Sequence, residues 1–205
     1  MMTAMMTKHL LALDVATVVG CCDGAIGGEP RLWSWFLDDA GPLRGARLHA
    51  LAGFLDRYFA QQPCDGVVYE APLGLGAMHR IGAQEATVAL LRGAVGVVEE
   101  RCYAHNKPVA DLPAQAARES VLGWRTHRKG QGVVVKRRKP VAGKPDVRDE
   151  TVKERIMREV ALYAVAPMND NEADAFVLWR FACNKENPRL ALASTPLFRE
   201  EESHG

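Results

Sequence analysis

The 205-residue chain contains no long apolar run, no cysteine pair with metal-ligand spacing and no internal repeat. Its most apolar stretch, Leu10 to Val19, is interrupted by Asp14, so we expect no membrane-spanning helix. No small-residue cleavage site follows that stretch, which argues against a secretory signal and favours a cytosolic protein. The five cysteines match no zinc-ribbon or redox motif, and we expect them to be reduced and mostly buried.

The chain also has little net charge, +1 in total, but this charge is unevenly distributed. The segment from Trp124 to Arg148 contains nine Lys or Arg residues and a single acid, Asp146. The rest of the chain carries 17 basic and 24 acidic residues, a net charge of −7. A concentrated cationic segment on an otherwise acidic chain is typical of an arm that binds a polyanion. We expect its cations to contact nucleic-acid phosphates, and they are Arg125, Arg128, Lys129, Lys136, Arg137, Arg138, Lys139, Lys144 and Arg148.

Length and composition predict one domain over residues 1–188, with a basic loop inserted at about 124–148 and an irregular tail over 189–205. The apolar patterns predict strands over 9–23, 31–37, 67–70 and 107–111, the first of them ending in a glycine-containing turn. They predict helices over 44–61, 84–103, 115–122, 149–163 and 170–181. Strands followed by alternating helices and strands favour an α/β fold, with a mixed sheet and helices on both faces.

Acidic residues stand where expected strands end and where the last expected helix begins. Asp14 and Glu70 each follow an apolar run, and Asp170 and Asp174 open the last helix. An unpaired carboxylate is expensive to bury, whereas carboxylates from distant segments can share a divalent cation through their oxygen atoms. The four acids therefore predict a metal site with catalytic potential.

These motifs, in this order, resemble those of the RuvC-type Holliday junction resolvases of the RNase H-like superfamily, in particular a phage or prophage member. The resemblance runs from about Leu10 to Phe181. It is based on the segments 11–14, 68–70, 81–82, 117–123 and 170–175, the last of which is the most specific. It implies a mixed five-stranded sheet flanked by helices. It also implies an endonuclease that uses two Mg²⁺ or Mn²⁺ ions to cut a four-way DNA junction in pairs of nicks, leaving a 5′-phosphate and a 3′-hydroxyl.

The resemblance also assigns roles to particular acids. Asp14 and Glu70 match the first two catalytic acids of the family, and Asp174 matches the last. The family places its remaining acid three residues before the last, where this chain has Asn171. Asp170 lies four residues before Asp174 on the same helical face and can substitute, whereas Glu172 is a weaker candidate.

Further contacts follow from the same resemblance. Arg118 matches a basic position near the active site of the family. The loop after Glu70 matches one that inserts an aromatic residue into the junction, but here its contact candidates are Leu73, Met78, His79 and Arg80. The helix over 84–103 matches the segment that pairs two subunits, so we expect a homodimer in which Gly93 and Gly96 allow close approach.

Three other interpretations stay open at this point. The chain could be a broader flap or debranching nuclease, or a junction-binding relative that lost catalysis because Asn171 replaces an acid. An actin-like ATP-binding protein also begins with an acid after its first strand. That class needs a glycine-rich phosphate turn directly afterwards, where this chain has Val15–Val18.

Overall fold

The computed structural model describes residues 8–72, 84–123, 152–163 and 165–189, with a five-stranded mixed sheet at the centre. The strands are β1 (His9–Asp14), β2 (Val18–Ala25), β3 (Arg31–Phe36), β4 (Gly66–Glu70) and β5 (Val109–Leu112). Their order across the sheet is β3-β2-β1-β4-β5. The pairs β1–β2 and β2–β3 are antiparallel, and the pairs β1–β4 and β4–β5 are parallel. The predicted mixed sheet is confirmed.

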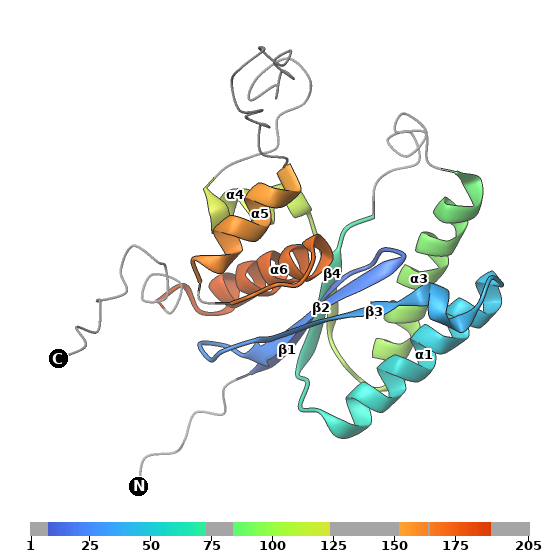
Figure 1. Ribbon diagram of the computed structural model, residues 1–205. Coiled ribbons are helices and arrows are strands. Elements are labelled where there is room, and N and C mark those ends of the chain that lie inside the picture. Colours follow the sequence, from blue (N-terminus) through green and yellow to red (C-terminus); the bar gives the residue numbers. More distant parts are fainter. Residues whose placement is uncertain (1–7, 73–83, 124–151, 164, 190–205) are drawn as a thin grey trace, which may run out of the picture.

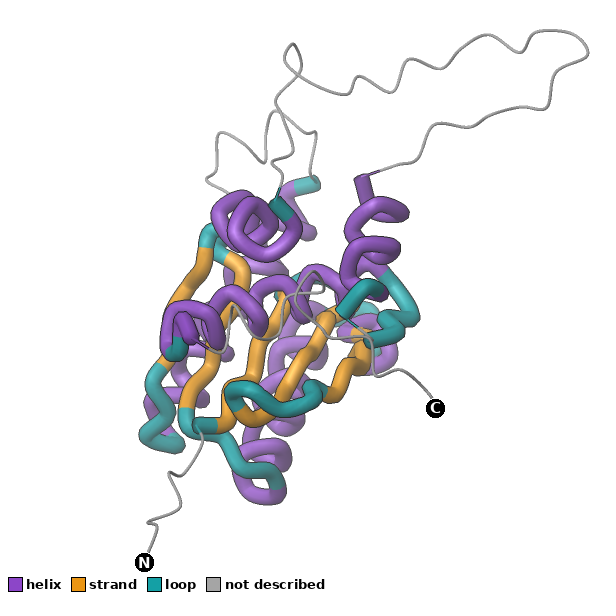
Figure 2. The backbone as a smooth tube through the Cα atoms, turned by 90° about the vertical axis from the view of Figure 1, so that its left-hand side faces the viewer, coloured by secondary structure: helices purple, strands orange, loops and turns teal. Residues whose placement is uncertain are grey.

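Helices cover both faces of this sheet (Figures 1 and 2). The 3₁₀ helix η1 (Leu37–Ala40) leads from β3 towards α1 (Arg44–Gln61), which packs with α3 (Glu85–Ala104) on one face. The other face carries α4 (Ala114–Leu122), α5 (Val152–Ala161) and α6 (Asp170–Glu186), with α6 directly against β1 and β2. No helix within the described residues is long and apolar enough to cross a membrane.

The central strand β1 supplies alternate residues to two separate cores. Leu11 and Leu13 pack towards α1 and α3, whereas Leu10 and Ala12 pack towards α6. Because both faces of the strand are buried, its sequence is a continuous apolar run rather than an alternating one. The strand ends at Asp14 because the next residues turn the chain back into β2.

This double burial explains one wrong prediction. Residues 9–23 do not form one strand with a glycine turn but an antiparallel hairpin, in which Leu13 pairs with Cys21. The turn lies at 15–17, inside a stretch that offers no glycine or proline to mark it. The predicted C-terminal end of α6 at Phe181 was also wrong, whereas its predicted start at Asp170 is confirmed. The helix α6 continues to Glu186, and α3 buries Leu90, Ala94 and Val98.

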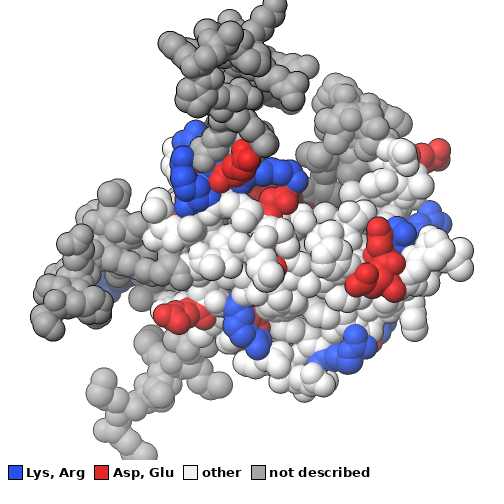
Figure 3. Space-filling view, viewed as in Figure 1, with Lys and Arg blue, Asp and Glu red and all other residues white. Residues whose placement is uncertain are grey.

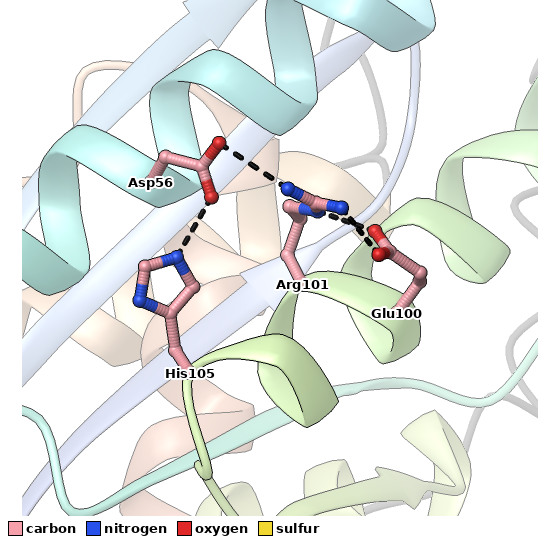
Figure 4. Close-up of polar contacts among 4 residues, drawn as sticks. All are labelled: Asp56, Glu100, Arg101 and His105. Atoms are coloured by element: carbon pink, nitrogen blue, oxygen red, sulfur yellow. Dashed lines mark hydrogen bonds and ion pairs between the residues drawn. The ribbon is translucent and has the colours of Figure 1, made fainter.

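The pair α1 and α3 is held by leucines and by a partly buried polar network. Asp56 on α1 accepts hydrogen bonds from His105 Nε2 at 2.8 Å and from Arg101 at 3.5 Å, and Arg101 also pairs with Glu100 (Figure 4). A Cβ atom on Gly93 would lie 2.8 Å from Leu48 Cδ1 on α1. Gly93 therefore serves the packing of α3 on its own chain, which corrects its predicted place in a dimer interface.

The start of α6 approaches β2 through a glycine. A Cβ atom on Gly20 would lie 2.0 Å from the Asn171 carbonyl oxygen, closer than any side chain allows. Gly20 is also the residue that pairs with Asp14 across the hairpin. The absence of a side chain at position 20 thus sets the distance between the first turn of α6 and the end of β1. The five cysteines, all described, are buried and free, as expected.

We predict that Gly20→Ala lowers the free energy of unfolding by about 2 kcal/mol or more, because the new methyl group must push α6 off the sheet. Denaturant unfolding measures this change. Gly45→Ala is the matched control, since a Cβ atom at that exposed position in α1 meets nothing within 4 Å. The control should gain about 0.5–1 kcal/mol from its better helix propensity. Equal stabilities of the two variants would contradict the packing argument.

Candidate functional site

Two of the predicted acids lie side by side at one edge of the sheet. Leu13 of β1 pairs with Tyr69 of the parallel strand β4, so Asp14 and Glu70 end neighbouring strands at the same level. Their carboxyl groups lie close enough to act on each other's pKa. Burial raises the pKa of Asp14 well above its ordinary value, and the charges of Glu70 and Asp174 raise it further.

The third acid reaches this edge from α6. The side chain of Asp174 is 16% exposed, and it lies close enough for its charge to act on both Asp14 and Glu70. Burial raises the pKa values of Glu70 and Asp174 as well. Three partly buried carboxyl groups from β1, β4 and α6 therefore repel one another at one point on the sheet.

A guanidinium group from α4 opposes this repulsion. Arg118 donates from Nε and Nη2 to one Asp174 oxygen, at 3.0 and 2.7 Å, and its own side chain is 17% exposed. Its charge lowers the pKa values of Asp14, Glu70 and Asp174, but burial prevails for all three. One cation thus offsets only part of the electrostatic cost of three acids.

The fourth acid lies at the margin of the site. Asp170 is the first residue of α6 and forms an ion pair with Lys153 of α5. Its charge acts on Asp174, one helical turn further along. Asp14, Glu70 and Asp174 thus act on one another, whereas Asp170 acts on Asp174 and is the more exposed of the two, at 26% against 16%.

The neighbouring residues of α6 have structural contacts instead. The buried Glu172 accepts hydrogen bonds from Ser34 Oγ at 2.5 Å, the Met168 N–H at 2.8 Å and Asn169 Nδ2 at 3.3 Å. In turn, the Asn169 side chain accepts from the Glu172 N–H and caps the helix. One Glu172 oxygen joins the start of α6 to Ser34 of β3 and the other accepts from the Met168 N–H, so both are engaged and Asp170 is the better fourth acid.

The donor set fits a hard divalent cation. Its members are carboxylates, they are partly buried, and they hold more negative charge than Arg118 and Lys153 can offset when all are ionised. Among the described residues, however, no three acids, histidines or cysteines already stand in metal-binding geometry. In this geometry Asp174 contacts Arg118 and Asp170 contacts Lys153.

The sequence analysis did not predict Lys153 as a residue of the site. The DNA-contact candidates of the two loops lie outside the residues that the structure describes. The described part of the chain does not include Leu73, Met78, His79, Arg80 or the basic residues from Arg125 to Arg148. Lys153 stands in the first turn of a helix, where the helix dipole disfavours a cation. A lysine at this unfavourable position is the feature of the sequence that could have indicated a functional role for Lys153.

We predict that Asp14→Asn stabilises the metal-free protein at pH 7–8. The folded state raises the pKa of Asp14, so its ionised form costs stability at neutral pH, and that cost fades as the pH falls through the raised pKa. A gain of at least about 1 kcal/mol would raise the melting temperature by ~2–4 °C in EDTA. Thermal unfolding at pH 4 and pH 8 tests this, since the difference from wild type should shrink at pH 4. A lower melting temperature at pH 8 would contradict it.

No protein-family model matches this sequence, and no curated protein matches it. The fold, in contrast, resembles solved structures of RuvC from Thermus thermophilus. One of them covers 87% of this chain and 96% of its own, with a TM-score of 0.58 and 15% identity. A second, in complex with a Holliday junction substrate, covers 87% and 95% with a TM-score of 0.58 and 14% identity. The chain therefore has a fold like that of RuvC, a mixed five-stranded sheet flanked by helices.

Proposed function

We propose that this protein is a metal-dependent, structure-selective DNA endonuclease that resolves four-way junctions by paired phosphodiester cleavage. The observation that carries the proposal is the convergence of Asp14, Glu70 and Asp174 from three elements, at a cost in charge repulsion that the fold does not need. Repulsion of this kind marks functional sites more often than structural ones. Similarity to a RuvC structure in complex with a Holliday junction supports the choice of substrate.

In this proposal the chain holds one or two Mg²⁺ or Mn²⁺ ions through Asp14, Glu70, Asp170 and Asp174. A bound divalent cation lowers the pKa of a water ligand and stabilises the charge on a leaving oxygen. The protein contributes the arrangement of oxygen ligands, with Asp14 and Glu70 on rigid strand ends and Asp174 on a helix packed against them. The products are a 5′-phosphate and a 3′-hydroxyl.

Arg118 and the basic segment from Trp124 to Arg148 bind the phosphates of the DNA in this proposal. Arg118 lies next to the acids and, once released from Asp174, can neutralise a phosphate at the point of cleavage. The nine cations between Arg125 and Arg148 add affinity that is sensitive to salt and largely independent of sequence. Leu73, Met78, His79 and Arg80 are the contacts proposed for the junction centre.

The proposal includes a homodimer through α3, since a four-way junction has two equivalent cleavage positions. On this helix, Gly96 is exposed with open space around its Cα atom, and Tyr103 is exposed as well. Sedimentation at micromolar concentration, with and without junction DNA, should show the dimer. A protein that remains a monomer in both conditions would remove this part of the proposal.

We predict that the protein nicks a labelled four-way junction symmetrically in Mg²⁺ or Mn²⁺, and cuts a flap or linear duplex less. Asp14→Asn and Asp174→Asn should each lower the rate by at least about 100-fold while junction binding persists, because each removes an oxygen ligand of the metal. Gel assays of cleavage and binding with the same DNA measure both effects.

Binding without cleavage in either metal would instead favour a branch-binding protein, in which Asn171 marks the loss of a catalytic acid. Faster cleavage of the flap than of the junction would favour the broader debranching nuclease.

We predict that Arg118→Gln weakens junction binding and flattens its salt dependence. Loss of one phosphate contact should reduce the slope of log K against log[salt] by about 0.9. Fluorescence anisotropy over a salt series, with DNA of unrelated sequences, measures the slope. Unchanged binding and unchanged cleavage would exclude Arg118 from the site.

A further inference from the structure

Lys153 contacts the candidate site from the first turn of α5. Its ammonium group forms an ion pair with Asp170, and its charge also lowers the pKa of Asp174. Its side chain is 73% exposed, whereas that of Asp170 is 26% exposed. The helix α5 packs on α6 through Ile156 and Val160, which lie further along the helix.

A structural role explains this lysine poorly. A surface ion pair of this exposure contributes little to folding, because water screens it and two side chains must be held in place. The first turn of α5 is also the least favourable place for a cation on that helix. Over α4 and α5, basic and acidic side chains gather on the same part of the surface (Figure 3). Lys153 therefore has the position of a functional cation.

We propose that Lys153 is a phosphate-binding residue that Asp170 holds in place until a divalent cation takes over the Asp170 carboxylate. The inference rests on the proposed function and deepens it. In the metal-free protein the lysine and the metal compete for the same oxygen atoms. After metal binding, the freed ammonium group lies beside the site and meets a DNA phosphate. Metal and DNA then bind cooperatively, because the first releases a cation that the second needs.

This exchange predicts opposite effects of one substitution. Lys153→Gln removes a competitor of the metal, so it should tighten binding of Mn²⁺ alone by about 1.5- to 5-fold, the range expected from breaking one exposed ion pair. The same change removes a phosphate contact, so it should weaken DNA binding in the metal-loaded state. A residue that only supported the fold of the site would weaken both.

The experiment uses the full chain and two readouts that do not depend on cleavage. Calorimetric titration with Mn²⁺ measures metal affinity. Junction binding is then measured over a salt series in EDTA and in Ca²⁺, with a gel to verify that the DNA stays intact. In wild type the slope of log K against log[salt] should be steeper in Ca²⁺ than in EDTA, and Lys153→Gln should reduce this difference by about 0.9.

Two further variants are controls. Lys8→Gln breaks another exposed ion pair, with Glu186, at the opposite end of β1 from Asp14, and should match wild type in both readouts. Lys153→Arg keeps the charge and should keep the slope difference.

An unchanged or lower Mn²⁺ affinity in Lys153→Gln, or an unchanged slope difference, would overturn the exchange while leaving the nuclease proposal intact. A wild-type protein that binds no Mn²⁺ would instead refute the metal site itself, and the exchange with it.

Discussion

The close contact between α6 and β2 determines the rest of the site. The Asn171 carbonyl lies where any side chain at position 20 would be, so α6 can begin directly over the hairpin that ends β1. From that start, Asp174 reaches Asp14 and Glu70, and Asp170 reaches Lys153. The polar contacts of Glu172 with Ser34 and Met168 hold the same turn in place. One backbone approach thus positions both acids of α6.

This arrangement destabilises the folded protein electrostatically. Burial and mutual repulsion raise the pKa values of Asp14, Glu70 and Asp174, although Arg118 lowers each of them. A carboxyl cluster of this kind destabilises the folded state at neutral pH, and a divalent cation is the ligand that removes the repulsion most directly. Stability and function therefore oppose each other at this edge of the sheet. Arg118 of α4 and Lys153 of α5 offset part of the repulsion among the carboxylates but not all of it.

Most of the fold could be predicted from the spacing of apolar residues and from the positions of glycine and proline. The bounds of α1 were predicted correctly, and Gly123, in the left-handed conformation with φ +75°, ends α4 where glycine indicated. The β1–β2 hairpin could not be predicted, since burial on both faces removes the apolar–polar alternation that marks strands, and no glycine or proline marks the turn at 15–17. The acids were predicted from their places at strand and helix ends. Lys153 was not, because its role depends on how α5 lies on α6, which no local pattern encodes.

The central claim is that Asp14, Glu70 and the acids of α6 hold a divalent cation. A crystal structure of the protein grown with Mn²⁺, with anomalous data, tests it most directly. The account predicts an anomalous peak bound by Asp14, Glu70 and Asp174, with Asp174 withdrawn from Arg118. Crystals at millimolar Mn²⁺ without such a peak, and with the contact between Arg118 and Asp174 intact, would contradict it.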